Sequence, residues 1–459
     1  MLASWSARRP ACTKPARPLS SRSGSFENWC RGEACLALLP MTRRYFGTDG
    51  VRGVVGADLT PDLVERIGKA ATLWSSGGRV LVGRDTRASG PELEQAVARG
   101  IVSAGGVAVL GGVLPTPAVA FLADELGVVV SASHNPPEYN GVKIFRSGGK
   151  LVDEQEEEIE ALLDGQAAGG GTIEERTGAA DAYLAHVLAS CGSDLTGMRI
   201  GLDCANGAFA ALAPGSFSQL GAEVHAIGTE PDGSNINVGC GATDLGALQH
   251  LVTSETLDLG LAFDGDGDRM LAVDGEGDVV DGDRILAVLA LALGVDVVAV
   301  TVMTNLGFHA LMEENGVRVV TTPVGDRYVS EALRREGGLL GGEQSGHVIW
   351  LGNHPTGDGL AAGLLLCRAL DGRRLADAAA VMPRFPQVVR NLAVARRELT
   401  QTILDESDRL NAELGSSGRV LVRPSGTEPV VRVLAEAENA ADAEKLCASI
   451  AALVERELG

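Results

Sequence analysis

The sequence has no apolar run long enough to cross a membrane. The longest such stretch of consequence, residues 285–295, ends at Asp296 after 11 residues, whereas a membrane-spanning helix needs about 20. Cysteine is also scarce, and the five cysteines beyond residue 40 stand singly, in neither a zinc-binding spacing nor a disulfide framework. We therefore expect no membrane partner and a reducing, cytoplasmic location.

Positive charge is in deficit over most of the chain. Lys and Arg number 39 against 60 Asp and Glu, which gives a net charge of −21. This balance argues against nucleic acid or an anionic membrane surface as a partner. An anionic substrate must instead find a local cluster of Arg and Lys, whose field is screened only beyond about 8 Å.

Residues 1–40 differ from the rest of the chain. They hold six basic and two acidic residues, are rich in Ser and Pro, and show no apolar periodicity. We predict that they are disordered or a non-native N-terminal extension. An organelle transit peptide is the alternative, but Met41 offers a second start, and we favour the extension.

The chain is too long for one ordinary core, which predicts several domains. Short runs of Val, Ile and Leu alternate with stretches of helix length, and this alternation indicates an α/β fold. After Pro386, two strands around a glycine-containing turn precede a helix predicted over 440–457, which is typical of a small α+β domain. The predicted domains are three α/β units over 41–180, 181–281 and 282–385, and an α+β domain over 386–459.

The run Ser-Ala-Ser-His-Asn-Pro at residues 131–136 is the most informative stretch. It follows an apolar strand predicted at 126–130, and Asn-Pro then turns the chain at once. Ser133 and His134 therefore lie on a loop at a strand end, where active-site residues gather. A hydroxyl beside an imidazole makes Ser133 a candidate phosphate carrier.

Asp264, Asp266 and Asp268 alternate with glycines directly after another apolar strand. Carboxylates at this spacing project to one side of an extended chain, and the glycines let the chain curl round a common point. The carboxylates repel one another unless a cation lies among them, and their oxygen atoms suit one Mg²⁺. A calcium EF-hand loop would need Gly and Glu where Arg269 and Gly275 stand. Solvated aspartates in a turn are the other alternative, and the flanking apolar strands argue against them.

Two further loops carry groups suited to a phosphorylated sugar. The loop at 423–429, followed by Arg432, combines hydroxyls, a glycine and guanidinium groups between two strands, which suits a phosphate. The loop at 341–347 sets a carboxylate, a hydroxyl and an imidazole among small residues, which suits sugar hydroxyls, with an ordinary surface turn as an equal alternative. The candidate ligands are Arg423, Ser425, Gly426, Thr427 and Arg432, and Glu343, Ser345 and His347.

Two basic residues accompany these loops. A glycine-rich turn at 47–53 contains Arg52, and Lys143 follows Ser133 after a short interval. The acidic run at 153–160 is predicted to be the solvated face of a helix without a catalytic role.

Taken in this order, the motifs resemble the α-D-phosphohexomutase superfamily, and the resemblance covers essentially residues 41–459. Several stretches are similar to the bacterial branch that acts on glucosamine phosphates, whereas Pro-Glu-Tyr-Asn at 137–140 is similar to phosphomannomutases. The stretches similar to the glucosamine branch are 46–53, 235–243, 324–329 and Gln344.

The resemblance implies a fold and an activity. The fold consists of three related α/β domains with mixed sheets and a smaller C-terminal α+β domain, around a central cleft to which each domain contributes a loop. The activity is the interconversion of glucosamine 6-phosphate and glucosamine 1-phosphate through a phosphoserine and a 1,6-bisphosphate, which supplies amino-sugar nucleotide and cell-wall precursor synthesis. A phosphomannomutase or phosphoglucomutase is the alternative within the class, and a non-catalytic phosphosugar-binding regulator is the alternative outside it.

The resemblance also implies roles for single residues. Ser133 carries the phosphoryl group as phosphoserine and joins the three aspartates as a ligand of one Mg²⁺. Lys143 and His347 are both candidates for the general acid and base. The residues expected around the transferring phosphoryl group are Arg52, His134, Lys143 and Arg269.

The other expected ligands and partners follow the same resemblance. Glu343 and Ser345 bind the sugar, and the loop from Arg423 to Arg432 binds the second phosphate. Glucosamine or glucose 1,6-bisphosphate is the expected activator, a small phosphosugar is the expected partner, and the chain is expected to be a monomer or a homodimer.

Overall fold

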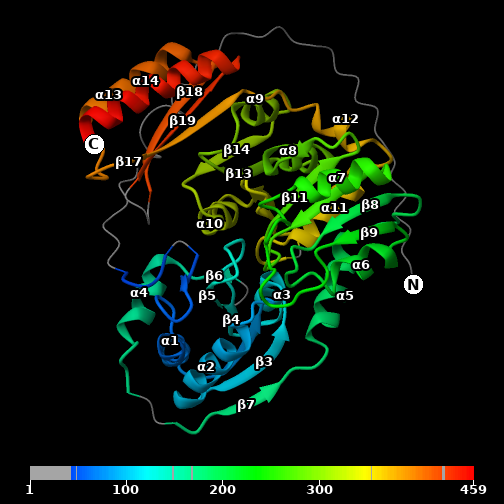
Figure 1. Ribbon diagram of the computed structural model, residues 1–459, viewed down its shortest axis with the longest axis vertical. Helices are drawn as coiled ribbons and strands as arrows, with labels where there is room; N and C mark the ends of the chain where they lie inside the picture. Colours follow the sequence, from blue (N-terminus) through cyan, green and yellow to red (C-terminus); the bar gives the residue numbers. More distant parts are fainter. Residues whose placement is uncertain (1–42, 48, 147–148, 167–168, 353, 426–429) are drawn as a thin grey trace.

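The computed structural model describes residues 43–459, apart from residues 48, 147–148, 167–168, 353 and 426–429 (Figure 1). The predicted extension over 1–40 and the candidate ligands Gly426 and Thr427 therefore lie outside the described residues. None of the helices in the described part of the chain is long and apolar enough to span a bilayer. The described chain forms an α/β fold of four domains, each with its own sheet, and the predicted fold class is confirmed.

The first sheet is mixed, with parallel strands at its centre. Its strand order is β1-β5-β4-β2-β3-β7, and β6 pairs with β5. β2 runs parallel to β3 and β4, whereas β5 runs antiparallel to β4 and β1. Every residue of β4 is buried, which explains its continuous apolar sequence. The strands are β1 (Val51–Val54), β2 (Arg79–Arg84), β3 (Val107–Val113), β4 (Leu126–Val130), β5 (Tyr139–Arg146), β6 (Gly149–Lys150) and β7 (Thr172–Glu175), and the helices are α1 (Pro61–Trp74), α2 (Gly90–Ser103), α3 (Thr116–Leu122) and α4 (Asp153–Ala161).

The second sheet repeats this plan on a smaller scale. Its order is β12-β11-β10-β8-β9, with β8 parallel to β9 and β10, and β11 antiparallel to β10. The aspartate loop leaves the carboxyl end of β10, where ligands of open α/β sheets bind. The elements are β8 (Arg199–Asp203), β9 (Glu223–Ile227), β10 (Leu259–Phe263), β11 (Met270–Asp274), β12 (Val279–Val280), α5 (Ala179–Cys191), α6 (Ala213–Gln219) and α7 (Gly246–Glu255).

The third sheet has the order β14-β13-β15-β16, with β16 antiparallel to β15 and the other pairs parallel. The apolar run at 285–295 lies mainly in the buried helix α8, as its length predicts. The elements are β13 (Val297–Thr301), β14 (Arg318–Thr322), β15 (Leu340–Gly342), β16 (Val348–Trp350), α8 (Gly282–Leu293), α9 (Leu306–Glu314), α10 (Asp326–Glu336), α11 (Gly359–Leu370) and α12 (Leu375–Ala379).

The C-terminal domain is an antiparallel sheet covered by two helices. Its strand order is β17-β19-β18, and the helices α13 and α14 pack against it (Figure 1). The buried apolar residues between Ile403 and Leu458 form a cluster of their own. The elements are β17 (Gln387–Ala393), β18 (Gly418–Pro424), β19 (Val430–Ala437), α13 (Gln401–Leu414) and α14 (Ala440–Leu458).

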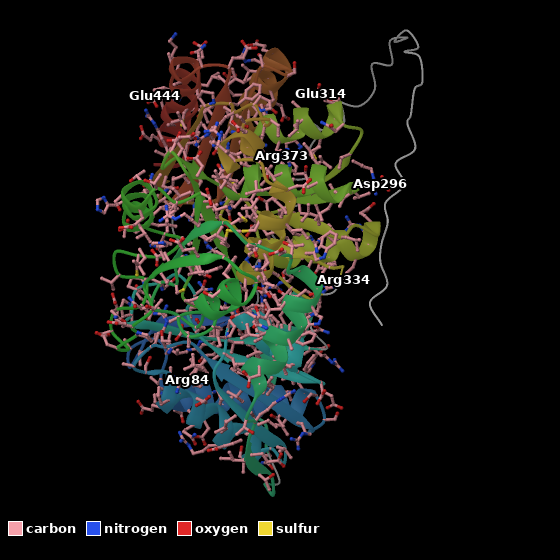
Figure 2. The ribbon with its side chains drawn as sticks, turned by 90° about the vertical axis from the view of Figure 1, so that its right-hand side faces the viewer. Arg84, Asp296, Glu314, Arg334, Arg373 and Glu444 are labelled. Carbon is pink, nitrogen blue, oxygen red and sulfur yellow. The ribbon has the colours of Figure 1, made fainter. Side chains whose placement is uncertain are left out.

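The first three domains, in contrast, are joined by a shared hydrophobic core, and the first domain has a second core of its own around α1 and α2. A single cluster of buried side chains contains Phe145 of β5, Tyr183 of α5, Phe263 of β10 and Leu364 of α11. Helix α5 packs against both α3 and α11 and so connects the first and third domains. Figure 2 shows the resulting elongated arrangement, with Glu444 of the C-terminal domain towards one end. The three α/β domains therefore form one packed body to which the C-terminal domain is attached.

Helix α4 corrects the prediction that the run at 153–160 is a solvated face. Glu156 is only 5% exposed and pairs with Arg43 and with Arg327 of α10. Burial raises the pKa of Glu156 to about 7, although both arginines act in the opposite direction. The acidic helix thus holds the start of the described chain and the third domain together.

Glu160, at the same helix, binds main-chain N–H groups. Its carboxylate accepts hydrogen bonds from the N–H groups of Arg44, Tyr45 and Phe46 at 2.8, 2.7 and 2.8 Å. Three N–H groups in a row are a strong site for a carboxylate. The residues just after position 43 are therefore bound into the first domain through this side chain.

A Glu160→Ala substitution should lower the free energy of unfolding by about 1–3 kcal/mol, because it leaves the three N–H groups without their acceptor. Urea denaturation followed by circular dichroism measures the change. Glu154→Ala, at an exposed position of the same helix, is the matched control and should cost less than about 0.5 kcal/mol. Equal losses in the two variants would contradict this interpretation.

Candidate active site

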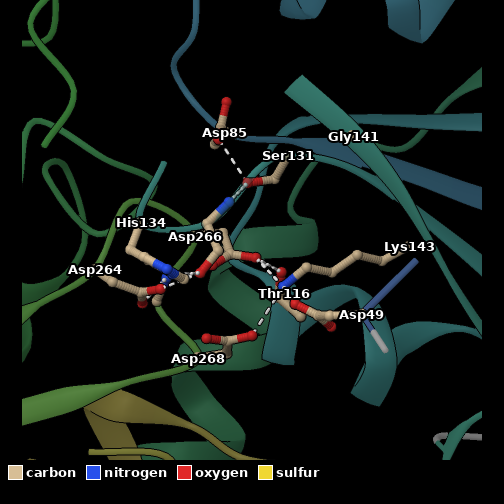
Figure 3. Close-up of polar contacts among 12 residues, drawn as sticks. Asp49, Asp85, Thr116, Ser131, His134, Gly141, Lys143, Asp264, Asp266 and Asp268 are labelled. Atoms are coloured by element: carbon tan, nitrogen blue, oxygen red, sulfur yellow. Dashed lines mark hydrogen bonds and ion pairs between the residues drawn. The ribbon is translucent and has the colours of Figure 1, made fainter. Parts of the chain in front are cut away.

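The serine loop leaves β4 at Val130 and holds Ser133 in a strained conformation. Ser133 is fully buried, with φ of 53°, in the left-handed region that L-residues rarely adopt. Its Oγ donates a hydrogen bond to Asp264 and lies 3.4 Å from Nδ1 of His134. Figure 3 shows the ring of His134 beside Asp264. Burial, reinforced by nearby arginines, lowers the pKa of His134 to about 4, so the ring is uncharged at neutral pH.

The carboxylate loop points three buried aspartates at one another. Asp264, Asp266 and Asp268 are at most 2% exposed, and ligand oxygen atoms from all three lie within 4.8 Å of one another. Gly267 turns the chain with φ of 79°, which favours glycine. Oδ1 of Asp264 accepts the N–H groups of Gly267 and Arg269, both at 3.1 Å. The loop thus presents acidic side chains inwards and binds one of them with its own backbone.

Lys143 brings positive charge from the first domain into this loop. Its Nζ lies 2.8 Å from Asp266, 2.9 Å from Asp268 and 3.2 Å from Asp49 (Figure 3). Burial alone lowers the pKa of Lys143, but these carboxylates outweigh it and hold the pKa well above its ordinary value. Thr116, the first residue of α3, donates its hydroxyl to Asp266 at 2.5 Å. Sequence reasoning found Lys143 but missed Asp49 and Thr116.

The aspartates fit a divalent metal ion. Burial and the two neighbouring carboxylates raise the pKa of Asp264 well above its ordinary value, which shows how closely the negative charges are packed. Oδ1 of Asp266 and Oδ1 of Asp268 are buried without a hydrogen-bond partner among the described residues. Carboxylate oxygen atoms left in this way are suitable ligands for a hard cation such as Mg²⁺. The three aspartates could therefore hold a metal ion.

A second charge network joins the first and third domains beside this loop. Nζ of Lys150 lies 2.5 Å from Asp49 and 2.8 Å from Asp326. Nε2 of His347 lies 3.1 Å from Asp326, and its Nδ1 lies 3.9 Å from Asp268. Burial lowers the pKa of His347, but the two carboxylates outweigh it and raise the pKa above its ordinary value. These carboxylates thus hold His347 towards the carboxylate loop.

In the C-terminal domain, Arg423 and Arg432 lie directly opposite each other on β18 and β19. Like charges in this position destabilise a sheet. Burial and the neighbouring Arg432 lower the pKa of Arg423. Glu343 is 8% exposed and accepts the N–H of Gly325 at 3.0 Å. Its negative charge acts to raise the pKa of both Arg423 and Arg269. Two facing guanidinium groups suit an anion such as a phosphate.

Most of the predicted site residues lie in these loops, and Arg52, Ser345 and Ser425 differ from the others in position or exposure. Arg52 lies on strand β1 rather than in a turn, where it pairs with Asp49 and contacts Asn135 at 3.5 Å. Ser345 is exposed, whereas Ser425 is buried and directly precedes the undescribed residues. The residues that sequence reasoning missed are Asp49, Thr116, Lys150 and Asp326.

The missed residues gave only weak signals in the sequence. Asp49 stands in the glycine-rich segment at 47–53, and Asp326 in the stretch at 324–329 that contributed to the family resemblance. Neither carried a recognisable chemical pattern, because their partners come from distant parts of the chain. Thr116, between two prolines, reads as an ordinary helix start.

Family models for four successive domains match the chain in order. They describe the phosphoglucomutase/phosphomannomutase domains I, II and III, at residues 43–168, 181–277 and 281–385, and the C-terminal domain of the same proteins at 371–453. The chain belongs to the phosphoglucomutase/phosphomannomutase family. The superfamily predicted from the motifs is therefore confirmed, and its four-domain plan accounts for the four sheets.

Within this family, curated relatives carry a more specific name. A phosphoglucosamine mutase of Thermobifida fusca is 47% identical over 443 residues, which cover 90% of this chain and 99% of that protein. A solved phosphoglucomutase/phosphomannomutase family protein of Burkholderia thailandensis is 26% identical, with a TM-score of 0.77 over 88% of this chain and 97% of that one.

A third relative has the same fold at lower identity. The N-acetylphosphoglucosamine mutase of Aspergillus fumigatus, solved in complex with GlcNAc-6P and magnesium, is 19% identical, with a TM-score of 0.61 over 94% of this chain and 99% of that one. This likeness shows the family fold. The metal and the sugar phosphate belong to that structure.

Asp268→Asn should weaken Mg²⁺ binding at least about tenfold, because it removes one of the three carboxylates expected to bind the ion. Isothermal titration calorimetry with MgCl₂ at constant ionic strength measures the affinity. Asp278→Asn, at an exposed position of the turn between β11 and β12, is the control and should leave the affinity unchanged. Unchanged Mg²⁺ affinity in the Asp268 variant would exclude this residue as a ligand.

Proposed function

We propose that the chain interconverts glucosamine 6-phosphate and glucosamine 1-phosphate through phosphorylated Ser133 and a 1,6-bisphosphate intermediate. The observation that carries the proposal is the buried hydroxyl of Ser133, hydrogen-bonded to Asp264 in a cluster of three aspartates. The relatives named phosphoglucosamine mutase support glucosamine as the sugar. Mg²⁺ is the proposed metal, and glucosamine or glucose 1,6-bisphosphate is the proposed activator that supplies the first phosphoryl group.

The chemistry consists of two phosphoryl transfers. In the first, the P–O bond to Ser133 breaks and a bond to O1 of glucosamine 6-phosphate forms, while O1 loses its proton and the serine oxygen regains one. After the bisphosphate turns round, the bond between phosphorus and O6 breaks and a bond to Oγ of Ser133 forms, while the serine hydroxyl loses its proton and O6 takes one up. The sugar leaves as glucosamine 1-phosphate, and the enzyme is again phosphorylated.

Positive residues around Ser133 neutralise the transferring group. Each phosphate carries about −1.5 to −2 charges at pH 7, and phosphoryl transfer depends mainly on position and charge. Lys143, Arg269 and Arg52 supply fixed positive charge, and His134, uncharged at neutral pH, offers a hydrogen bond. When bound, Mg²⁺ supplies two further positive charges and polarises a phosphoryl oxygen.

Lys143 and His347 are the two candidates for moving the proton of the sugar hydroxyl. Carboxylates raise the pKa of both side chains in spite of their burial. The protonated form of either side chain donates a proton to the oxygen that leaves, and the same group then acts as a base. Lys143 lies nearer to the aspartates, whereas Asp326 orients His347.

The C-terminal loop is proposed to hold the phosphate that is not being transferred. Arg423 and Arg432 face each other across β18 and β19, and their positive charges repel each other. An anion bound between them offsets this repulsion. Glu343 and Ser345 are the proposed ligands of the sugar hydroxyls. The remaining proposed phosphate ligands are Ser425, Gly426 and Thr427.

Ser133→Ala should abolish turnover, because the phosphoryl group then has no carrier. Intact-mass analysis after incubation with glucose 1,6-bisphosphate and Mg²⁺ should show one phosphoryl group on the unmodified chain and none on the variant. Ser254→Ala, at an exposed position of α7, is the control and should behave as the unmodified chain. Turnover by the Ser133 variant would refute the covalent mechanism.

The same preparation separates the alternative functions. Coupled assays should show a higher kcat/KM for glucosamine 6-phosphate than for glucose or mannose 6-phosphate. A preference for mannose would favour a phosphomannomutase, to which residues 137–140 are similar. No phosphoryl group on Ser133 under any activating condition would favour a phosphosugar-binding regulator.

Arg423→Gln should raise the KM for glucosamine 6-phosphate at least about tenfold, because a charge-assisted hydrogen bond to phosphate is lost. The free energy of unfolding should fall by less than about 0.5 kcal/mol, since the repulsion from Arg432 is relieved as well. Arg390→Gln, on β17 of the same sheet and paired with Glu444, is the control for both measurements. An unchanged KM would remove Arg423 from the phosphate site.

A further inference from the structure

The main chain of Ser133 is held on both sides by buried side chains. Its N–H donates to Oγ of Ser131 at 2.9 Å, and that hydroxyl donates to Asp85 at 2.6 Å. Its carbonyl oxygen accepts one hydrogen bond from Arg87 and one from Asn237, both at 2.9 Å. Because the left-handed conformation is costly for serine, these bonds stabilise an arrangement that the loop alone would rarely adopt.

Arg87 binds four carbonyl oxygen atoms of the serine loop, including that of Ser133. It lies between β2 and α2, is fully buried, and pairs with Asp85 at 2.8 Å. The rest of its guanidinium group donates to carbonyl oxygen atoms of the serine loop. A guanidinium group has five donors in fixed directions, so a loop whose carbonyl groups accept four of them, with Asp85 accepting the fifth, is confined to one shape. The carbonyl partners belong to Ser133 (2.9 Å), Asn135 (2.8 Å), Pro136 (2.5 Å) and Tyr139 (2.9 Å).

Asn237 reaches the same loop from the second domain. Its Nδ2 donates to the carbonyl oxygen atoms of Ser133 at 2.9 Å and of Asn135 at 3.1 Å. The carboxylate loop packs against this contact, since a Cβ at Gly265 would lie 2.6 Å from the Ser133 carbonyl oxygen and 2.9 Å from Nδ2 of Asn237. Arg87 and Asn237 both bind the main-chain carbonyl of Ser133 rather than its hydroxyl, so both act on the position of the loop.

We infer that Arg87 and Asn237 are positioning residues that fix the direction of the Ser133 hydroxyl towards the carboxylate loop. This inference rests on the proposed function. Phosphoryl transfer is sensitive to small displacements of the reacting atoms, because aligned reactants avoid most of the entropic cost. Loss of either residue lets the serine main chain relax towards ordinary dihedral angles and turns Oγ away from Asp264.

The test measures single-turnover phosphoryl transfer from the phosphorylated enzyme to glucosamine 6-phosphate by rapid quench. Asn237→Gly keeps the left-handed backbone, since φ is 59° at this position, and removes only the amide donor. Arg87→Lys keeps a positive charge beside Asp85 and loses the fork of donors. We expect the transfer rate constant to fall about 10-fold in Asn237→Gly and about 100-fold in Arg87→Lys, with KM within about twofold of the unmodified enzyme.

The control is Asn235→Ala, two residues from Asn237. The Asn235 side chain donates to the carbonyl oxygen of Glu230 within its own loop, and its loss should leave the transfer rate within about twofold. Thermal unfolding and Mg²⁺ affinity are measured on each variant.

Each outcome has one meaning. Slow transfer with an unchanged KM and unchanged Mg²⁺ affinity supports the inference. Transfer at the normal rate in both variants, or equal slowing in Asn235→Ala, overturns it, as does a loss of thermal stability without a change in transfer rate. Absence of transfer by the unmodified enzyme would contradict the proposed function, and the inference with it.

Discussion

Three carboxylates that are buried within 4.8 Å of one another dominate the arrangement of the molecule. Removing several like charges from water is costly unless opposite charges and hydrogen-bond donors surround them. The chain supplies these groups from a different domain, with Lys143 on β5 and the hydroxyl of Thr116 on α3. The negative charge of the aspartate loop is therefore balanced by groups of the first domain, and these contacts hold the first and second domains together. The hydrogen bond between Ser133 and Asp264 lies at the same interface.

A chain of oppositely charged groups connects the aspartate loop to the other domains. Asp49 lies between Lys143 and Lys150, and Lys150 in turn reaches Asp326 of the third domain. The negative charge of Glu343 stabilises the charged forms of Arg269 and of Arg423 in the C-terminal domain. Groups of alternating sign thus extend from the aspartate loop to each domain, so the site and the domain interfaces share the same side chains.

Local patterns in the sequence were sufficient for much of this structure. The strands that precede the serine and aspartate loops are short runs of branched apolar residues, and the structure has them as β4 and β10. The chemistry of Asp264, Asp266 and Asp268 could be predicted because the three residues are neighbours in sequence, and their geometry follows from their spacing. The sequence likewise predicted Arg423 and Arg432 beside one loop between two strands, whereas their direct pairing across β18 and β19 is visible only in the structure.

What could not be predicted depends on residues that meet only after folding. Lys150 and Asp326 are 176 positions apart, and Glu156, expected to be solvated, is buried against Arg43 over a separation of 113 positions. Hydrophobic periodicity assigns a charged residue to the solvent side of a helix, and it cannot report an arginine that arrives from another domain. The same limit applies to Thr116, whose hydroxyl has a partner only because α3 begins beside the aspartate loop.

The shared core of the first three domains has a consequence for biosynthesis. Helix α3 of the first domain packs on α5, and α5 packs on α11, which is the chain between residues 359 and 370. As the ribosome releases the chain from its N-terminal end, the first domain can assemble the core that α1 and α2 form with its own sheet. The face of α5 that packs on α11 stays uncovered until residues 359–370 have emerged. Domains commonly fold as units during synthesis, but the packing between the first and third domains forms only when most of the protein exists. The C-terminal domain, whose core consists of its own residues, has no such dependence.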